Sequence, residues 1–204
     1  MRFPTVTPSR FAALAVLLLG TSAAQAHTGH LGHDGASLMQ GLLHPISGLD
    51  HLLAMFAVGL WSVSALPAGK AWWGPATFMA ALTASAALGM AGVALPQLEL
   101  LIALSVVLFG AMLVLPRTAL PVPAGLGLVA LAASLHGLAH GAEAPLSGGL
   151  GYALGMLLTS AALHVCGLAA GQGVRRYAAR HTRPLLASAG ALLGTAGLYL
   201  AAQI

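Results

Sequence analysis

The sequence predicts an all-α membrane protein, a polytopic helix bundle of about six transmembrane helices that follow a cleavable signal peptide. Of its 204 residues, 58% are hydrophobic and only 6% are charged, and the mean hydropathy is +0.90. A soluble domain of this size does not bury so much apolar surface, so the composition is typical of a polytopic membrane protein. Apolar stretches of about 20 residues, the length that crosses a ~30 Å hydrocarbon core, recur along the chain.

The first 26 residues have the pattern of a secretory signal. Arg2 and Arg10 form a positive beginning, a short apolar run follows, and Ala24-Gln25-Ala26 matches an A-x-A cleavage site. The alternative is an uncleaved first helix, although the apolar run is short for a span. Cleavage after Ala26 would leave the mature N-terminus on the outer side of the inner membrane. The expected divisions are a signal peptide at 1–26, a His-rich periplasmic N-terminus at 27–35 and a transmembrane domain at 36–204.

Six apolar stretches follow, and prolines fall near the breaks between them because proline cannot donate a hydrogen bond inside a helix. Gly151 and Gly155, and likewise Gly190 and Gly194, have the four-residue spacing that lets helices approach closely in lipid. We expect the spans at residues 46–66, 72–93, 97–115, 122–141, 147–170 and 184–203.

The distribution of Lys and Arg orients the bundle and excludes nucleic-acid binding. Eight basic residues, spread over the N-terminus and short loops, form no patch for a nucleic acid. If the mature N-terminus is outside, the inner loops hold six Lys and Arg and the outer loops hold none, as the positive-inside rule requires. Six spans return the C-terminus to the periplasmic side. The single cysteine, Cys166, excludes an internal disulfide and a four-cysteine zinc site.

Two histidines and an aspartate stand at the start of the first expected span. Ionisable groups at membrane depth are rare and mark ion or proton paths. We expect Pro45 in the first helical turn, with His44 as a non-helical residue just before it. His51 follows two turns later on about the same side, and Asp50 would be a direct ligand or would fix the histidine tautomer. The alternative is that these residues only cap the helix.

A second group ends the fourth span. His136, His140 and Glu143 have i, i+4, i+7 spacing and so share one helical face at the outer level. The alternative is polar residues that face lipid headgroups. His164, in the inner half of the fifth span, would be a second station on a path across the membrane; the alternative is a histidine bonded to a neighbouring helix.

The mature N-terminus adds His27, His30 and His33 between glycines, a tract that would gather metal or would be only a polar tail. The chain has neither a G-x4-G-K-[ST] phosphate loop nor an H-E-x-x-H zinc-protease motif. Ligands of His, Asp and Glu rather than paired Cys argue against Cu(I) and favour Ni(II), Co(II), Zn(II) or Mn(II).

The segment from His44 to Met55, HPISGLDHLLAM, resembles the signature of the HupE/UreJ family, small secondary permeases for nickel or, in some members, cobalt. The resemblance extends to the His-rich start, to HGLAHG at residues 136–141 and to the Arg-rich loop before the last span. It implies that His44, Asp50 and His51 bind metal, with His136, His140 and Glu143 following. It also implies supply of metal for hydrogenase or urease maturation, or for cobalamin.

The sequence therefore predicts a permease, not an enzyme, that moves Ni2+ or Co2+ across the bacterial inner membrane and holds no permanent cofactor. Its expected partners are the ion and the bilayer, with no nucleic acid. Because ligand imidazoles must be neutral, uptake should fall at low pH. The alternatives are an intramembrane zinc hydrolase and a metal-binding sensor or assembly subunit. The choice of metal, the driving force and assembly into a homo-oligomer stay open.

Overall fold

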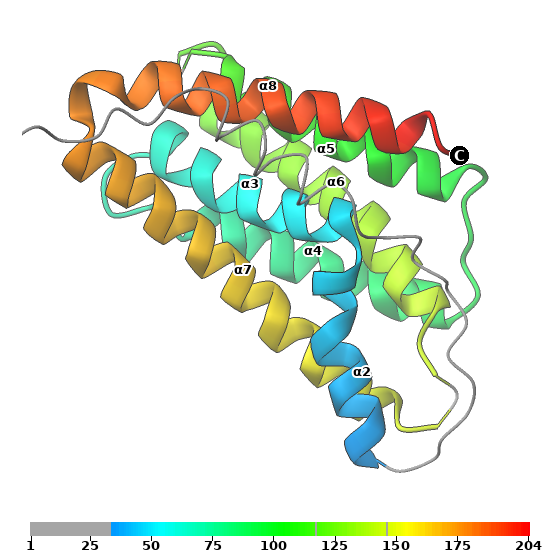
Figure 1. Cartoon of the computed structure of the whole chain (residues 1–204). Helices are drawn as coiled ribbons and strands as arrows, with labels where there is room; N and C mark the ends of the chain where they lie inside the picture. Colours follow the sequence, from blue (N-terminus) through cyan, green and yellow to red (C-terminus); the bar gives the residue numbers. More distant parts are fainter. Residues whose placement is uncertain (1–33, 117, 146) are drawn as a thin grey trace, which may run out of the picture. The chain divides into compact units, whose positions relative to one another are not determined.

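The computed structural model describes residues 34–116, 118–145 and 147–204, and these residues form helices and connecting turns without a strand. The predicted all-α fold class is confirmed. Figure 1 shows the helices in chain order, from α2 in blue to α8 in red. They are α2 (Asp34–Ser47), α3 (Leu49–Ala65), α4 (Trp73–Met90), α5 (Leu98–Val114), α6 (Val122–Ala142), α7 (Gly149–Tyr177), the short 3-10 helix η1 (Ala179–His181) and α8 (Thr182–Ala201).

Each of the six expected spans is present as a helix, from α3 to α8. The largest difference in length is in α7, which runs past the expected end at residue 170 to Tyr177. In the described part of the chain, three helical segments (α6, α7, and η1 with α8) are long and apolar enough to cross a membrane, and the bent pair α2–α3 could form a fourth span. α5 is apolar but has only 17 residues. The chain is thus a membrane protein, and the count of six spans stays a prediction.

The helix α2 was not expected, and it corrects the interpretation of His44. The sequence predicted a non-helical His44 before a helix that begins near Pro45, but both residues lie in the last turns of α2. The break comes later, at Gly48, whose extended backbone (φ −86°, ψ 112°) turns the chain by 75° between α2 and α3. Two donors still satisfy the carbonyl of His44: the Gly48 N–H at 3.2 Å and the Ser47 hydroxyl at 2.8 Å. Pro45 has no N–H to donate to the preceding turn, so α2 lacks one hydrogen bond close to its end at Ser47.

Glycines bring neighbouring helices into backbone contact. In Figure 1, α2 lies against α7, α4 against α6 and α5 against α8. A Cβ on Gly41 of α2 would collide with the Tyr152 carbonyl of α7, and a Cβ on Gly155 of α7 would collide with the Leu38 carbonyl of α2. Gly155 and Gly190, singled out by their spacing, both make such contacts. Close packing of small residues is the usual way in which helices associate in lipid.

The core between the helices is apolar, and two arginines donate hydrogen bonds to the C-terminal carbonyls of α3 and α5. Met55, Phe78 and Phe109 are fully buried in this core. Arg175 Nη1 donates to the Val63 carbonyl at 3.0 Å, near the C-terminal end of α3. The guanidinium of Arg183 donates to the carbonyls of Leu113, Val114 and Leu115, where α5 ends. These bonds satisfy carbonyl groups that have no partner within their own helix.

Candidate metal centre

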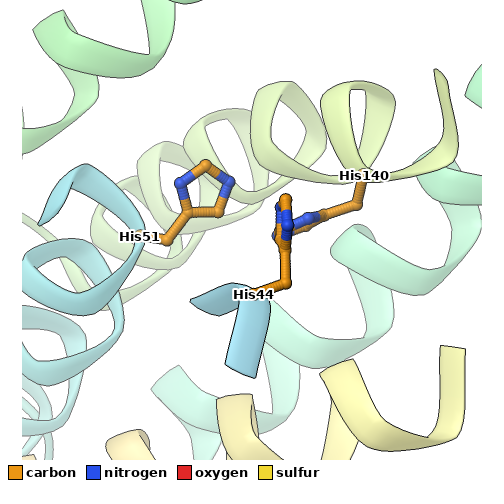
Figure 2. A group of neighbouring side chains, drawn as sticks. All are labelled: His44, His51 and His140. Carbon is orange, nitrogen blue, oxygen red and sulfur yellow. The ribbon is translucent and has the colours of Figure 1, made fainter. Parts of the chain in front are cut away.

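Three helices bring three imidazoles to one point. His44 comes from α2, His51 from α3 and His140 from α6, and one ring nitrogen of each lies within 4.8 Å of the others. Figure 2 shows the three side chains directed toward a common space. The ring centroid of His140 is 4.8 Å from that of His44 and 4.4 Å from that of His51. Three imidazole nitrogens this close could hold a divalent transition metal if the rings moved slightly closer together around it.

Carboxylates hold two of the imidazoles. Asp50 Oδ1 lies 2.6 Å from His51 Nδ1 and also accepts the backbone N–H of His51 at 2.7 Å. A proton on Nδ1 leaves Nε2 of His51 free for a metal, the orienting role expected of an outer-shell carboxylate. Glu143 Oε2 lies 3.1 Å from His44 Nε2. A Cβ on Gly48 would stand only 3.0 Å from Asp50 Oδ1 and from His51 Nδ1, so the bend residue also leaves room for the Asp50–His51 pair.

Several ring nitrogens of the site are buried without a hydrogen-bond partner among the described residues. They include His51 Nε2 and both ring nitrogens of His140, whose side chain is 1% exposed. A buried polar atom without a partner costs about 1–3 kcal/mol, and native proteins hold few of them. Unpartnered nitrogens that meet at one point therefore indicate a ligand that completes them, such as a metal ion.

His136 lies one turn before His140 on α6 and is fully buried. Its ring is 4.8 Å from that of His51, but its Nε2 meets the Ser105 hydroxyl of α5 at 2.9 Å. His136 thus borders the cluster of three histidines without belonging to it. Its other nitrogen, Nδ1, is buried without a partner among the described residues.

His164, on α7, does not belong to the cluster of His44, His51 and His140. Its Nδ1 bonds to the Ser160 carbonyl at 2.7 Å, one turn back on the same helix, and its Nε2 is buried without a partner in the described structure. The ring centroid of Phe78 lies 5.9 Å from that of His136 and 4.8 Å from that of His164. Phe78 therefore neighbours both histidine rings, and His164 lies outside the group of His44, His51 and His140.

Comparison with known proteins identifies the family. The family profile described as HupE / UreJ protein matches residues 14–200. The chain is also similar to Protein HupE of Rhizobium leguminosarum bv. viciae, with 40% identity over 187 residues that cover 87% of this chain and 93% of the relative. The chain belongs to the HupE/UreJ family. This family is associated with nickel and cobalt uptake for hydrogenase and urease. No solved structure matches the chain.

In this HupE/UreJ chain, the structure adds residues that sequence reasoning missed. Ser105 contacts His136, Phe78 neighbours His136 and His164, and Tyr152 lies beside His44. Each stands alone in an apolar stretch, so no spacing pattern indicated it. His27, His30 and His33 lie outside the described residues.

Proposed function

We propose that this HupE/UreJ protein moves Ni2+ or Co2+ inward across the bacterial inner membrane and is not an enzyme. One observation carries the proposal: three imidazoles from three helices converge, with buried nitrogens that lack any partner among the described residues. Ligands drawn from separate helices bind an ion only while those helices keep their positions, so a shift between helices would release it. A carrier needs an affinity high enough to capture the ion and low enough to release it.

The residues would have distinct roles in this transport. His44, His51 and His140 would hold the ion, while Asp50 and Glu143 would orient two of the imidazoles and offset part of the charge of the ion. The tract of His27, His30 and His33 would collect metal at the periplasmic face, once the signal peptide at 1–26 is removed. Both mature termini would then lie on the periplasmic side.

The inner half of the path would use the deeper histidines. From the outer cluster the ion would pass His136 and reach His164 beside the Phe78 ring. Leu168 and Gln172, one and two turns after His164 on the same face of α7, line a cavity of about 430 Å3. Arg175 also lines this cavity, and its guanidinium is bonded to the Val63 carbonyl. These features support release toward the arginine-rich side.

The test is metal flux into liposomes that contain the purified chain, with Ni2+, Co2+ or Zn2+ added outside. We expect Ni2+ or Co2+ to enter, and we expect His44→Ala, Asp50→Ala and His51→Ala to lower the initial rate at least tenfold, since even outer-shell changes weaken metal sites about 10- to 100-fold. His181→Ala is the matched control, because His181 is an exposed histidine in η1, outside the cluster.

The other possible results of the flux assay distinguish the alternatives. Unchanged flux in all three variants would refute the assignment of these residues to the metal site. Tight stoichiometric Zn2+ binding without flux would favour the intramembrane hydrolase or the metal-binding sensor or assembly subunit. Uptake by whole cells, followed by hydrogenase, urease and cobalamin assays, would identify the process that the metal supplies.

A further inference from the structure

Tyr152 places a fourth helix at the metal centre. It lies in the first turn of α7, which begins after Gly148, and its side chain is only 5% exposed. Its ring centroid is 5.7 Å from that of His44, with the ring planes at 64°. Backbone contact between Tyr152 and Gly41 of α2 holds the two helices together, so the position of the phenol relative to His44 is fixed.

The hydroxyl of Tyr152 has no assigned role. Its oxygen is buried and meets no hydrogen-bond partner among the described residues. A phenylalanine would fill the same apolar space without leaving a polar atom unsatisfied. A buried phenol beside an imidazole cluster is satisfied if something bound in the cluster accepts its proton in a hydrogen bond.

The coordination chemistry of the cluster indicates what that acceptor is. Three imidazoles leave one position open on a four-coordinate ion such as Zn2+. They leave three open on a six-coordinate ion, the usual state of hydrated Ni2+ and Co2+. Water molecules fill those positions, so a donor beside the cluster has three bound waters to meet on a six-coordinate ion and only one on a four-coordinate ion. A water held between an ion and a protein donor binds almost as well as a direct contact.

We infer that the Tyr152 hydroxyl donates a hydrogen bond to a water molecule that stays on the bound ion, and that it thereby favours six-coordinate Ni2+ or Co2+ over four-coordinate Zn2+. Tyr152 is then a specificity-determining residue that acts through the hydration shell of the ion. This inference rests on the proposed function, because it requires the cation to bind at His44, His51 and His140.

The experiment compares Tyr152→Phe with wild type in the purified full chain, by titration with Ni2+, Co2+ and Zn2+. One lost hydrogen bond should weaken Ni2+ and Co2+ binding about three- to tenfold and Zn2+ binding less than twofold. The visible spectrum of bound Co2+ should shift from the weak bands of six-coordination toward the intense bands of four-coordination, a change that a purely structural role would not produce. Tyr199→Phe, at an exposed tyrosine of α8, is the matched control.

Three results would overturn the inference. Equal weakening of all three ions would make Tyr152 a packing residue, and unchanged binding of all three would place its hydroxyl outside the site. His140→Ala separates failure of this inference from failure of the proposed function. If His140→Ala abolishes binding but Tyr152→Phe leaves the ratio of Ni2+ to Zn2+ affinity unchanged, only the inference about Tyr152 fails. If His140→Ala binds like wild type, the centre itself is wrong and the inference fails with it.

Discussion

Substitution of Gly141 by alanine should displace His140, because it pushes α6 away from α4. Gly141 faces α4, and a Cβ there would collide with the Ala86 carbonyl and lie 2.8 Å from the Met90 nitrogen. Ordinary contacts begin near 3.4 Å, and both neighbours are backbone atoms that cannot swing aside as a flexible side chain would. α4 and α6 must therefore separate by more than half an ångström, and His140, the preceding residue, moves with α6.

A displacement of that size exceeds what a metal site tolerates. Sites of this kind need their groups within about 0.5 Å of the productive geometry. We expect Gly141→Ala to weaken Ni2+ binding about 10- to 100-fold and to lower the free energy of unfolding by about 1–3 kcal/mol. Ni2+ titration and thermal unfolding of the purified chain in detergent measure the two effects.

Gly127 provides the control on the same helix. A Cβ at Gly127 would meet no atom within 4 Å, so Gly127→Ala should change neither binding nor stability appreciably. The reasoning is refuted if Gly141→Ala binds Ni2+ like wild type. It is also refuted if Gly127→Ala loses as much affinity, because the effect would then belong to any alanine in α6.

Two further predictions concern stability. Arg183→Gln removes donors from the carbonyls at the end of α5. It should lower the free energy of unfolding in thermal scans by only about 1–2 kcal/mol, because part of that network is exposed. Arg176→Gln, at an arginine stacked over Tyr177, should change this free energy little, and equal losses in the two variants would contradict the role of Arg183. Ni2+ at 100 times its Kd should raise the free energy of unfolding of the wild-type chain by about 2.7 kcal/mol. The same Ni2+ concentration should leave the free energy of unfolding of His140→Ala unchanged. An equal rise in that variant would place the bound ion elsewhere.

The helices were predictable because lipid requires long apolar stretches, and prolines fall near their ends. The same reasoning places the start of a helix at Pro45, whereas Pro45 lies inside α2 and the bend lies at Gly48. A proline is compatible with the first turn of one helix and with the last turns of another, and the local sequence does not distinguish these cases. The difference was decided by packing of α2 on α7, which involves residues such as Gly41 and Gly155 that are far apart in the sequence.

Much of the candidate site was predictable from residue type. His44, His51 and His140 stood out because ionisable groups are costly in an apolar chain, and the structure brings them together. Helical spacing placed His136 beside His140, but it could not show that the Ser105 hydroxyl meets one nitrogen of His136. Tyr152 gave no signal at all, since an isolated tyrosine in an apolar helix is ordinary until its neighbours in space are known.

The origin of the ligands in α2, α3 and α6 has a consequence for biosynthesis. His44 and His51 leave the ribosome well before His140, and at about 5–20 residues per second the interval is roughly 4 to 18 s. Until α6 has been made and inserted, the growing chain offers only two of the three imidazoles. A copy truncated before α6 therefore lacks one of the three imidazoles, and the full set of candidate ligands exists only once α6 is in place.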